Sequence, residues 1–267
     1  MTSLRTLVTA LAGLLAATLA HADLTIGVSA SLTGPTSALG IPTKNGIELW
    51  PKTIAGEKVN VILLDDATDP TVAVKNTRRF ITEDKVDVIV GSVATPVAAA
   101  MADVAAEGQT VQLMLSPVNL PEGKGAYSFR MPQSTAVMAI PIVEHWKKTG
   151  VKTYGFLGYA DAYGEAWLKD IQAVADKAGI KLIATERFAR ADTSVTGQAL
   201  KLVSANPDAI LVAASGSGAA MPHKGLVERG YAKAKIYQTH GAATKDLMRV
   251  GGADVEGSFV SSGPAVV

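Results

Sequence analysis

The feature that most constrains the fold of this chain is a repeated alternation of strand-like and helix-like segments. Short apolar runs rich in β-branched residues, which are typical of buried parallel strands, alternate with longer helical patterns. In the first series, strands are predicted at Leu24–Ser29, Val59–Leu64, Val86–Val90 and Val111–Leu115, with helices over Ser37–Lys52, Pro70–Asp84 and Pro96–Glu107. This alternation requires crossover connections and therefore predicts a parallel sheet with helices on both faces.

The alternation begins again after a link around residues 127–135. The second series of strands is predicted near Lys152–Gly158, Ile180–Arg187, Ala209–Ala214 and Ala234–Gln238. Its helices are predicted at Ala136–Thr149, Tyr163–Ala178, Val195–Ala205, Ala219–Arg229 and Thr244–Val250. Because each series is about as long as a domain, the sequence predicts an α/β protein with two lobes, residues 23–133 and 134–260.

The first 22 residues have the three parts of a secretory signal. Arg5 supplies a positive charge, Leu7–Leu19 is apolar, and Ala20-His21-Ala22 forms a small-residue cleavage signal. We expect residues 1–22 to be a signal peptide removed before Asp23, so that the mature chain is periplasmic; a retained anchor is the alternative.

Charge and cysteine content exclude several classes of function. Without Arg5 the 25 basic residues become 24, which balance the 24 acidic residues. This balance argues against nucleic acid or an anionic membrane surface as a partner. The sequence has no cysteine, so disulfides, a thiol nucleophile and a zinc–thiolate site are all excluded.

Polar residues gather where the predicted strands end, which is where open α/β sheets bind ligands. The segments concerned are Ser29–Pro35, Gly91–Thr95, Ser116–Leu120, Tyr159–Tyr163, Ser215–Gly218 and His240-Gly241. Within Gly91–Thr95, Ser92 and Thr95 supply hydroxyls, and Thr95-Pro96 predicts a helix start capped by Thr95. The open amides of that helix favour a ligand carboxylate. The alternative is an ordinary turn in which Thr95 only caps its helix.

Motifs for catalysis and metal binding are missing from the sequence. It contains no Gly-x-Ser-x-Gly, no Gly-x-Gly-x-x-Gly after a strand, no phosphate-binding loop and no His-Glu-x-x-His. Asp65, Asp66 and Asp69 could form a metal cluster, but carboxylates at such positions are more typical of caps. We expect no enzyme activity, metal or cofactor. An exported hydrolase using Ser217 and His240 is the alternative.

The motifs occur in an order that resembles the branched-chain amino-acid-binding (Leu/Ile/Val-binding) family of periplasmic receptors for ABC transporters. They are SLTGP followed by Gly40, LDDATDP, GSVAT, LSPVN, DAYGEAW and GGADVEG. The resemblance implies a two-lobed type I periplasmic binding protein, each lobe a parallel sheet flanked by helices. It further implies a monomeric receptor that delivers a small carboxylate to an ABC permease in the inner membrane. A ligand-sensing regulatory subunit is an alternative that the sequence leaves open.

The resemblance also implies ligand-binding residues in the first lobe. Thr95, beside Ser92, occupies the position that holds the ligand carboxylate. Val118 occupies the position of a main-chain contact. Leu120 falls at a hydroxyl position and cannot serve that role, so Asn119 is the candidate to compensate.

In the second lobe, the resemblance implies that Tyr163 contacts the ligand and that Ser215 lies near another contact. His240 stands where amino-acid-binding members carry a glutamate that pairs with the ligand ammonium. A buried ammonium needs a counter-charge that imidazole cannot supply, and the nearby Asp161 is no obvious replacement. We therefore predict a carboxylate without an α-amino group, such as an aromatic or oxo acid. An amino-acid ligand is the alternative.

The end of the sequence also departs from the family. Family members continue well beyond the position at which this sequence stops. Residues 261–267 are expected to form a hinge that returns toward the first lobe, and the resemblance implies that parts of both lobes are missing.

Overall fold

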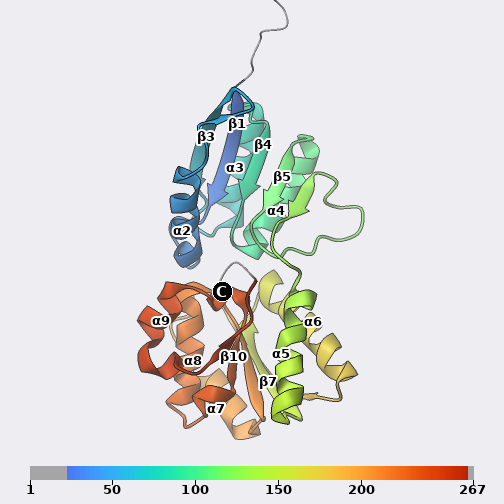
Figure 1. The fold of residues 1–267 in the computed structure, drawn as a ribbon, viewed down its shortest axis with the longest axis vertical. Coiled ribbons are helices and arrows are strands. Elements are labelled where there is room, and N and C mark those ends of the chain that lie inside the picture. The colour runs from blue at the N-terminus through green and yellow to red at the C-terminus, as the bar shows by residue number, and fades with distance from the viewer. Residues whose placement is uncertain (1–22, 264–267) are drawn as a thin grey trace, which may run out of the picture.

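The computed structural model describes residues 23–263, which form two lobes joined end to end (Figure 1). Each lobe is built on its own sheet, with strand order β2-β3-β1-β4-β5-β6 in the first and β11-β10-β9-β7-β8 in the second. The predicted signal peptide and residues 264–267 lie outside the described residues. None of the described helices is both long and apolar enough to cross a membrane.

The sheet of the first lobe is parallel except at one edge. It contains β1 (Leu24–Ala30), β2 (Thr53–Ile54), β3 (Glu57–Asp65), β4 (Val88–Gly91), β5 (Val111–Met114) and β6 (Ser128–Arg130). The edge strand β2 is antiparallel to β3 and was not predicted, because two exposed residues make no hydrophobic pattern. The other edge strand, β6, was missed for a similar reason: it has three residues, none of them buried.

Helices cover both faces of this sheet, as the alternation predicts. They are α2 (Ser37–Glu48), α3 (Pro70–Thr82) and α4 (Thr95–Glu107). Phe80 of α3 and Met101 of α4 are fully buried in one cluster, with Ile89 of β4. On the other face, Ile47 of α2 belongs to a cluster with Val28 of β1. The covering helices thus fix where the carboxyl ends of β1, β4 and β5 emerge.

The second lobe is a wholly parallel sheet around one large core. Its strands are β7 (Thr153–Tyr159), β8 (Lys181–Phe188), β9 (Ala209–Ala213), β10 (Ile236–Gln238) and β11 (Phe259–Val260). Its helices are α5 (Thr135–Thr149), α6 (Ala162–Lys177), α7 (Thr196–Ala205), α8 (Ala220–Val227) and α9 (Lys245–Gly251). Trp146 of α5 and Trp167 of α6 are fully buried in this core.

The prediction that Thr95 caps helix α4 is wrong. Ala94 is the N-cap residue, Thr95 is already the first helical residue, and no side-chain cap bond forms. By contrast, Asp161 does cap α6, since its carboxylate accepts hydrogen bonds from the amides of Tyr163 and Gly164. The hydroxyl of Thr95 is therefore available for another purpose.

Candidate ligand-binding site

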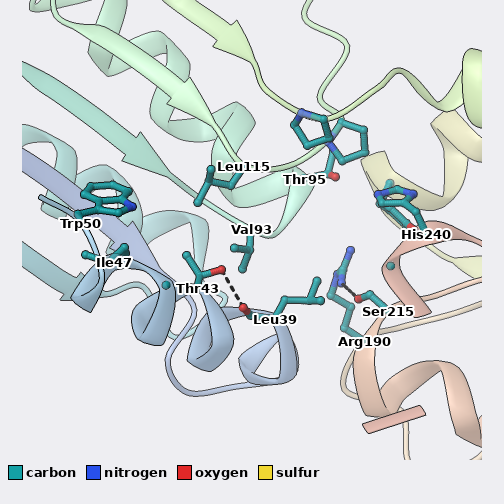
Figure 2. Close-up of a pocket in the computed structure, with 15 residues that line it drawn as sticks. Leu39, Thr43, Ile47, Trp50, Val93, Thr95, Leu115, Arg190, Ser215 and His240 are labelled. Carbon is teal, nitrogen blue, oxygen red and sulfur yellow. Dashed lines mark hydrogen bonds between the residues drawn. The ribbon is translucent and has the colours of Figure 1, made fainter. Parts of the chain in front are cut away.

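A cavity of about 430 Å³ lies between the two lobes at the carboxyl ends of their strands (Figure 2). The first lobe contributes α2 and Trp50 just after it, the first residue of α4, and the loops after β4, β5 and β6. The second lobe contributes the first turn of α6 and the loops after β8, β9 and β10. The lining residues are Leu39, Thr43, Gly46, Ile47, Trp50, Val93, Thr95, Leu115, Pro117, Pro132, Tyr163, Arg190, Ser215, His240 and Gly241.

The two lobes approach closely beside this cavity. Nη1 of Arg190 lies 3.5 Å from Oγ1 of Thr36, which joins the second lobe to the turn that precedes α2. Gly216, in the turn after β9, faces Ala38 of α2, and a Cβ added to Gly216 would lie 2.6 Å from the Ala38 Cβ. The start of α2 is therefore the part of the first lobe nearest to Arg190.

Four of the eight residues predicted to bind the ligand line the cavity: Thr95, Tyr163, Ser215 and His240. Oγ1 of Thr95 is buried and has no hydrogen-bond partner among the described residues. A buried hydroxyl without a partner carries an unrecovered desolvation penalty, which a ligand oxygen would relieve. The hydroxyl of Ser215 accepts a hydrogen bond of 3.2 Å from Nη1 of Arg190.

Ser92 does not line the cavity, because its hydroxyl is committed to the interior of the first lobe. It donates to Oδ2 of Asp66 at 2.8 Å, and Asp66 also accepts hydrogen bonds from the hydroxyls of Ser29 and Ser31. Asp66 thus hydrogen-bonds to the ends of both β1 and β4.

No group of three side chains suited to a metal ion occurs within residues 23–263.

Val118, Asn119 and Leu120 also lie outside the cavity lining. Val118 is buried in a small cluster, and the partly buried Leu120 packs against that cluster. The exposed Asn119 uses its side-chain oxygen to accept a 2.6 Å hydrogen bond from Arg130. In this arrangement the three side chains stabilise the loop between β5 and β6. The neighbouring Pro117 lines the cavity instead.

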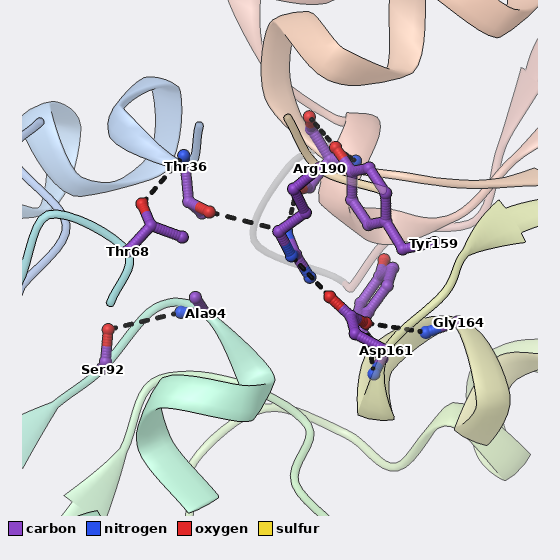
Figure 3. Close-up of polar contacts among 10 residues, drawn as sticks. Thr36, Thr68, Ser92, Ala94, Tyr159, Asp161, Gly164 and Arg190 are labelled. Atoms are coloured by element: carbon purple, nitrogen blue, oxygen red, sulfur yellow. Dashed lines mark hydrogen bonds and ion pairs between the residues drawn. The ribbon is translucent and has the colours of Figure 1, made fainter. Parts of the chain in front are cut away.

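Arg190 is the main site residue that the sequence did not reveal (Figure 3). Its Nε donates to Oδ2 of Asp161 at 2.6 Å, and its guanidinium lies 4.1 Å from the centre of the Tyr159 ring. Its side chain is only 12% exposed. One signal could have found it: Arg190 comes two residues after β8, at the same sheet edge as the other binding loops.

His240 is a neutral side chain at the cavity wall. Its ring stacks on Trp167 and lies 5.6 Å from the Tyr163 ring. Burial lowers the pKa of His240 to about 4, so the imidazole is uncharged at neutral pH. Burial likewise raises the pKa of Tyr163 to about 12, and its hydroxyl shares a 2.8 Å hydrogen bond with Thr239. Neither residue can neutralise a charged ligand.

We expect the burial of His240 to make the protein less stable in mild acid. Its pKa is lower in the folded state, about 4, than in the unfolded chain, about 6.5, so the unfolded chain binds the extra proton. This contribution to stability is present above pH 6.5 and is lost as the pH falls towards 4. Between pH 7 and pH 5, His240 alone should reduce the free energy of unfolding by about 2 kcal/mol.

The measurement is urea unfolding at pH 7, 6 and 5, compared with a His240→Asn variant. The burial of His223 acts in the same direction, because it too lowers the histidine pKa, so the variant should retain part of the pH dependence. An identical pH dependence in both proteins would contradict the role of His240.

Comparison with known proteins identifies the family. Residues 23–265 match the periplasmic binding protein family. The chain belongs to the periplasmic binding protein family. The predicted resemblance and the predicted type I fold, with two parallel sheets flanked by helices, are thereby confirmed.

Three known proteins illustrate the similarity. An extracellular ligand-binding receptor from Rhodopseudomonas palustris is 48% identical, with a TM-score of 0.88 over 91% of this chain and 67% of its own. The Leu/Ile/Val-binding protein BraC3 of Rhizobium johnstonii is 30% identical over 85% of this chain and 63% of its own length. A solute-binding protein of an ABC transporter from R. palustris, in complex with 3,4-dihydroxybenzoic acid, is 24% identical with a TM-score of 0.78, over 87% of this chain and 66% of its own.

By their names, the first of these proteins is an extracellular ligand-binding receptor and the second is a Leu/Ile/Val-binding protein. The chain spans about two thirds of their length. The distant match to the 3,4-dihydroxybenzoic acid complex shows a shared fold.

Proposed function

We propose that this protein is an extracytoplasmic solute receptor that binds a small carboxylate lacking an ammonium group. In this proposal the exported protein is periplasmic and delivers its ligand to an ABC permease in the inner membrane. The observation that carries the proposal is the charge of the cavity wall. Among the described residues that line it, Arg190 is the one ionised side chain, and none is a carboxylate.

An amino-acid ligand would need a partner for its ammonium group, and this site offers none. Asp161 is the nearest candidate, but both of its oxygens are occupied: Oδ1 caps α6, and Oδ2 accepts from Arg190. His240 is neutral and adjoins the aromatic rings of Trp167 and Tyr163. Burying an ammonium group here would cost several kcal/mol with no compensating opposite charge.

The site does suit a carboxylate attached to an apolar group. Arg190, Ser215 and Thr95 provide hydrogen-bond donors, and Arg190 is held in place by Asp161 and Tyr159 before a ligand arrives. Guanidinium groups bind carboxylates through charge-assisted, often bidentate hydrogen bonds. Most of the remaining wall is aliphatic or aromatic, which favours an aromatic or oxo acid over a strongly polar solute.

A matched pair of ligands provides the sharpest test. Leucine and its 2-oxo analogue, 4-methyl-2-oxopentanoate, have the same carbon skeleton but differ in the α-substituent, an ammonium group or a carbonyl. Titration calorimetry with this pair and with benzoate should show binding of the acids without an ammonium and none of leucine. At one hundred times its Kd, a bound acid should stabilise the folded protein by about 2.7 kcal/mol. Failure of every acid to bind would overturn the proposal.

The competing function is an amino-acid receptor, and it is favoured by the names of two curated relatives, both Leu/Ile/Val-binding proteins. Tight binding of leucine would establish this alternative.

A sensor subunit with the same ligand would bind the same acids, so transport assays with the permease separate it from a receptor. The hydrolase alternative finds no support: Ser217 does not line the cavity, and no hydrogen bond joins it to His240 among the described residues.

Replacing Thr95 by Val should weaken binding without destabilising the free protein. Because the Thr95 hydroxyl is buried and unpartnered and caps nothing, its loss should leave the free energy of unfolding unchanged or slightly higher. Loss of one hydrogen bond to a charged ligand should weaken binding by about 1.5–3 kcal/mol. Calorimetry and urea unfolding test the two halves, and Thr95→Ser should retain affinity. Equal affinity of Thr95→Val and the unmodified protein would exclude Thr95 from the contact.

A further inference from the structure

We propose that the ligand carries a second oxygen close to its carboxylate, and that this oxygen accepts a hydrogen bond from His240. The inference rests on the proposed function and deepens it, because it assigns the ligand to the oxo and hydroxy acids. It also makes His240 a residue that determines specificity. The observation that carries it is a neutral imidazole at the cavity wall, neither of whose nitrogens has a hydrogen-bond partner among the described residues.

The two ring nitrogens of His240 differ in their surroundings. Nδ1 is buried and has no hydrogen-bond partner, whereas Nε2 is the nitrogen that remains accessible. Because the chain's own atoms enclose Nδ1, a ligand in the cavity can reach the ring only at Nε2. Figure 2 shows the His240 ring at the same end of the cavity as Arg190 and Ser215.

The burial of Nδ1 also decides which nitrogen of His240 carries the proton. In a neutral imidazole one nitrogen donates through its N–H, and the other has only a lone pair. A buried N–H without an acceptor is rarer in native proteins than a buried acceptor without a donor. The lone pair is therefore assigned to the unpartnered Nδ1, and the proton to Nε2. It follows that His240 presents a hydrogen-bond donor to the ligand.

His240 lies close to the groups that bind the carboxylate in the proposed function. The guanidinium of Arg190 is 5.8 Å from the centre of the Tyr163 ring, and the centre of the His240 ring is 5.6 Å from it. Gly241 packs beside Ser215, since a Cβ added to Gly241 would lie 2.8 Å from the Ser215 Cβ. A ligand whose carboxylate lies at Arg190 therefore brings its next few atoms within reach of Nε2.

The carboxylate has sufficient donors without His240. Of the five N–H groups of Arg190, the two on Nη2 make no hydrogen bond among the described residues. The buried hydroxyl of Thr95 is also unpartnered. Because these groups can satisfy both carboxylate oxygens, the Nε2–H of His240 is left for a different acceptor. A ligand that lacks such an acceptor would leave this donor unpaired once it fills the cavity, and would bind more weakly.

Two matched pairs of acids test the proposal on the unmodified protein. The first pair is 4-methyl-2-oxopentanoate and 4-methylpentanoate, and the second is 3-hydroxy-3-phenylpropanoate and 3-phenylpropanoate. Within each pair the carbon skeleton and the carboxylate are the same, and only the first acid has an additional oxygen, on carbon 2 or on carbon 3. Titration calorimetry should show tighter binding of the acid with the additional oxygen, by about fivefold to 150-fold, in at least one pair.

Substitutions of His240 show whether the imidazole is the source of this preference. His240→Phe keeps an aromatic ring beside Trp167 and Tyr163 but removes the donor, so it should bind both acids of a pair equally or favour the acid without the additional oxygen. His240→Gln restores an N–H donor and should recover part of the preference. The control is His145→Phe, which removes an imidazole of the same lobe outside the cavity lining and should retain the preference.

Nitrogen NMR of the protein with isotope-labelled histidine gives a readout that a purely structural role would not change. The signals of His240 are identified by their absence from His240→Phe. They should show a protonated Nε2 and an unprotonated Nδ1, and the Nε2 signal should shift more with the acid that carries the additional oxygen than with its partner. A proton on Nδ1 would overturn the assignment of His240 as the donor.

The outcomes separate this inference from the function on which it rests. Equal affinity within both pairs, with binding that still depends on Arg190, would overturn the second oxygen and leave the carboxylate receptor intact. No binding of any acid would overturn the receptor proposal, and this inference with it. If His240→Phe weakened binding of both acids of a pair by the same factor, the imidazole would contact the carboxylate itself, which would also overturn the inference.

Discussion

An Arg190→Ala variant should bind its carboxylate ligand about 30-fold to several thousand-fold more weakly than the unmodified protein. Arg190 is the one cationic side chain among the described residues that line the cavity, and it is 12% exposed. Removing one member of a buried, hydrogen-bonded charge pair costs about 2–5 kcal/mol of binding energy, and about 3 kcal/mol corresponds to a factor above 100. Titration calorimetry with the tightest-binding acid would measure the loss.

Arg190→Lys should recover only part of this affinity. The guanidinium bonds in several directions at once, since Nε donates to Asp161 while Nη1 donates to Ser215 and approaches Thr36. A lysine ammonium preserves the charge but not the planar fork that holds these partners together. We therefore expect an affinity between those of the unmodified protein and Arg190→Ala.

Arg187 supplies the matched control, because it lies near the end of β8, three residues before Arg190. It is 41% exposed and pairs with Glu165 at the surface, outside the cavity lining. Exposed ion pairs contribute little, about 0–1 kcal/mol, so Arg187→Ala should leave ligand affinity within about twofold. If Arg190→Ala bound the ligand as tightly as Arg187→Ala, the carboxylate would have to lie elsewhere.

The sequence was sufficient to predict the architecture because strand and helix signals in an α/β protein are local. Strands such as β7 and β9 are buried along most or all of their length and are therefore continuous apolar runs. The missed strands are short and lie at sheet edges: β2 is two exposed residues, and β6 has none buried. An edge strand has few apolar contacts, and so its residues carry little pattern to detect.

The site was predicted only in part, for a different reason. Thr95, Tyr163, Ser215 and His240 line one cavity because topology places the carboxyl ends of parallel strands at one edge. The role of Arg190 depends on contacts that no local pattern encodes, including one with Thr36, which is 154 residues away in the chain.

The aliphatic wall of the cavity was missed for a related reason. Apolar residues such as Leu39 and Ile47 follow the same helical pattern as core residues, and sequence alone does not tell a cavity wall from a core. The four predicted residues outside the cavity illustrate the converse. Ser92 and Asn119, for example, are polar residues at strand ends, but they hydrogen-bond to Asp66 and Arg130 within their own lobe.

Gly164→Ala should be strongly destabilising, with a loss of about 3 kcal/mol in the free energy of unfolding, the upper end of the usual cost of overpacking. Gly164 lies in the first turn of α6, which packs directly on the last residue of β7. A Cβ at this position would lie 1.8 Å from the carbonyl oxygen of Tyr159. Because that oxygen belongs to the backbone, no side-chain rotation can relieve the overlap, and α6 must move relative to the sheet.

Gly46→Ala is the matched control for this substitution. Gly46 also lies within a helix, but an added Cβ meets no atom within 4 Å, and alanine favours a helix over glycine by about 1 kcal/mol. Urea unfolding should therefore show the two Gly→Ala variants shifted in opposite directions. The displacement of α6 in Gly164→Ala would also move Tyr163 and the Asp161 that orients Arg190, so ligand affinity should fall together with stability. Unchanged stability in Gly164→Ala would show that α6 can shift from β7 without penalty, and would contradict the close contact that sets this side of the site.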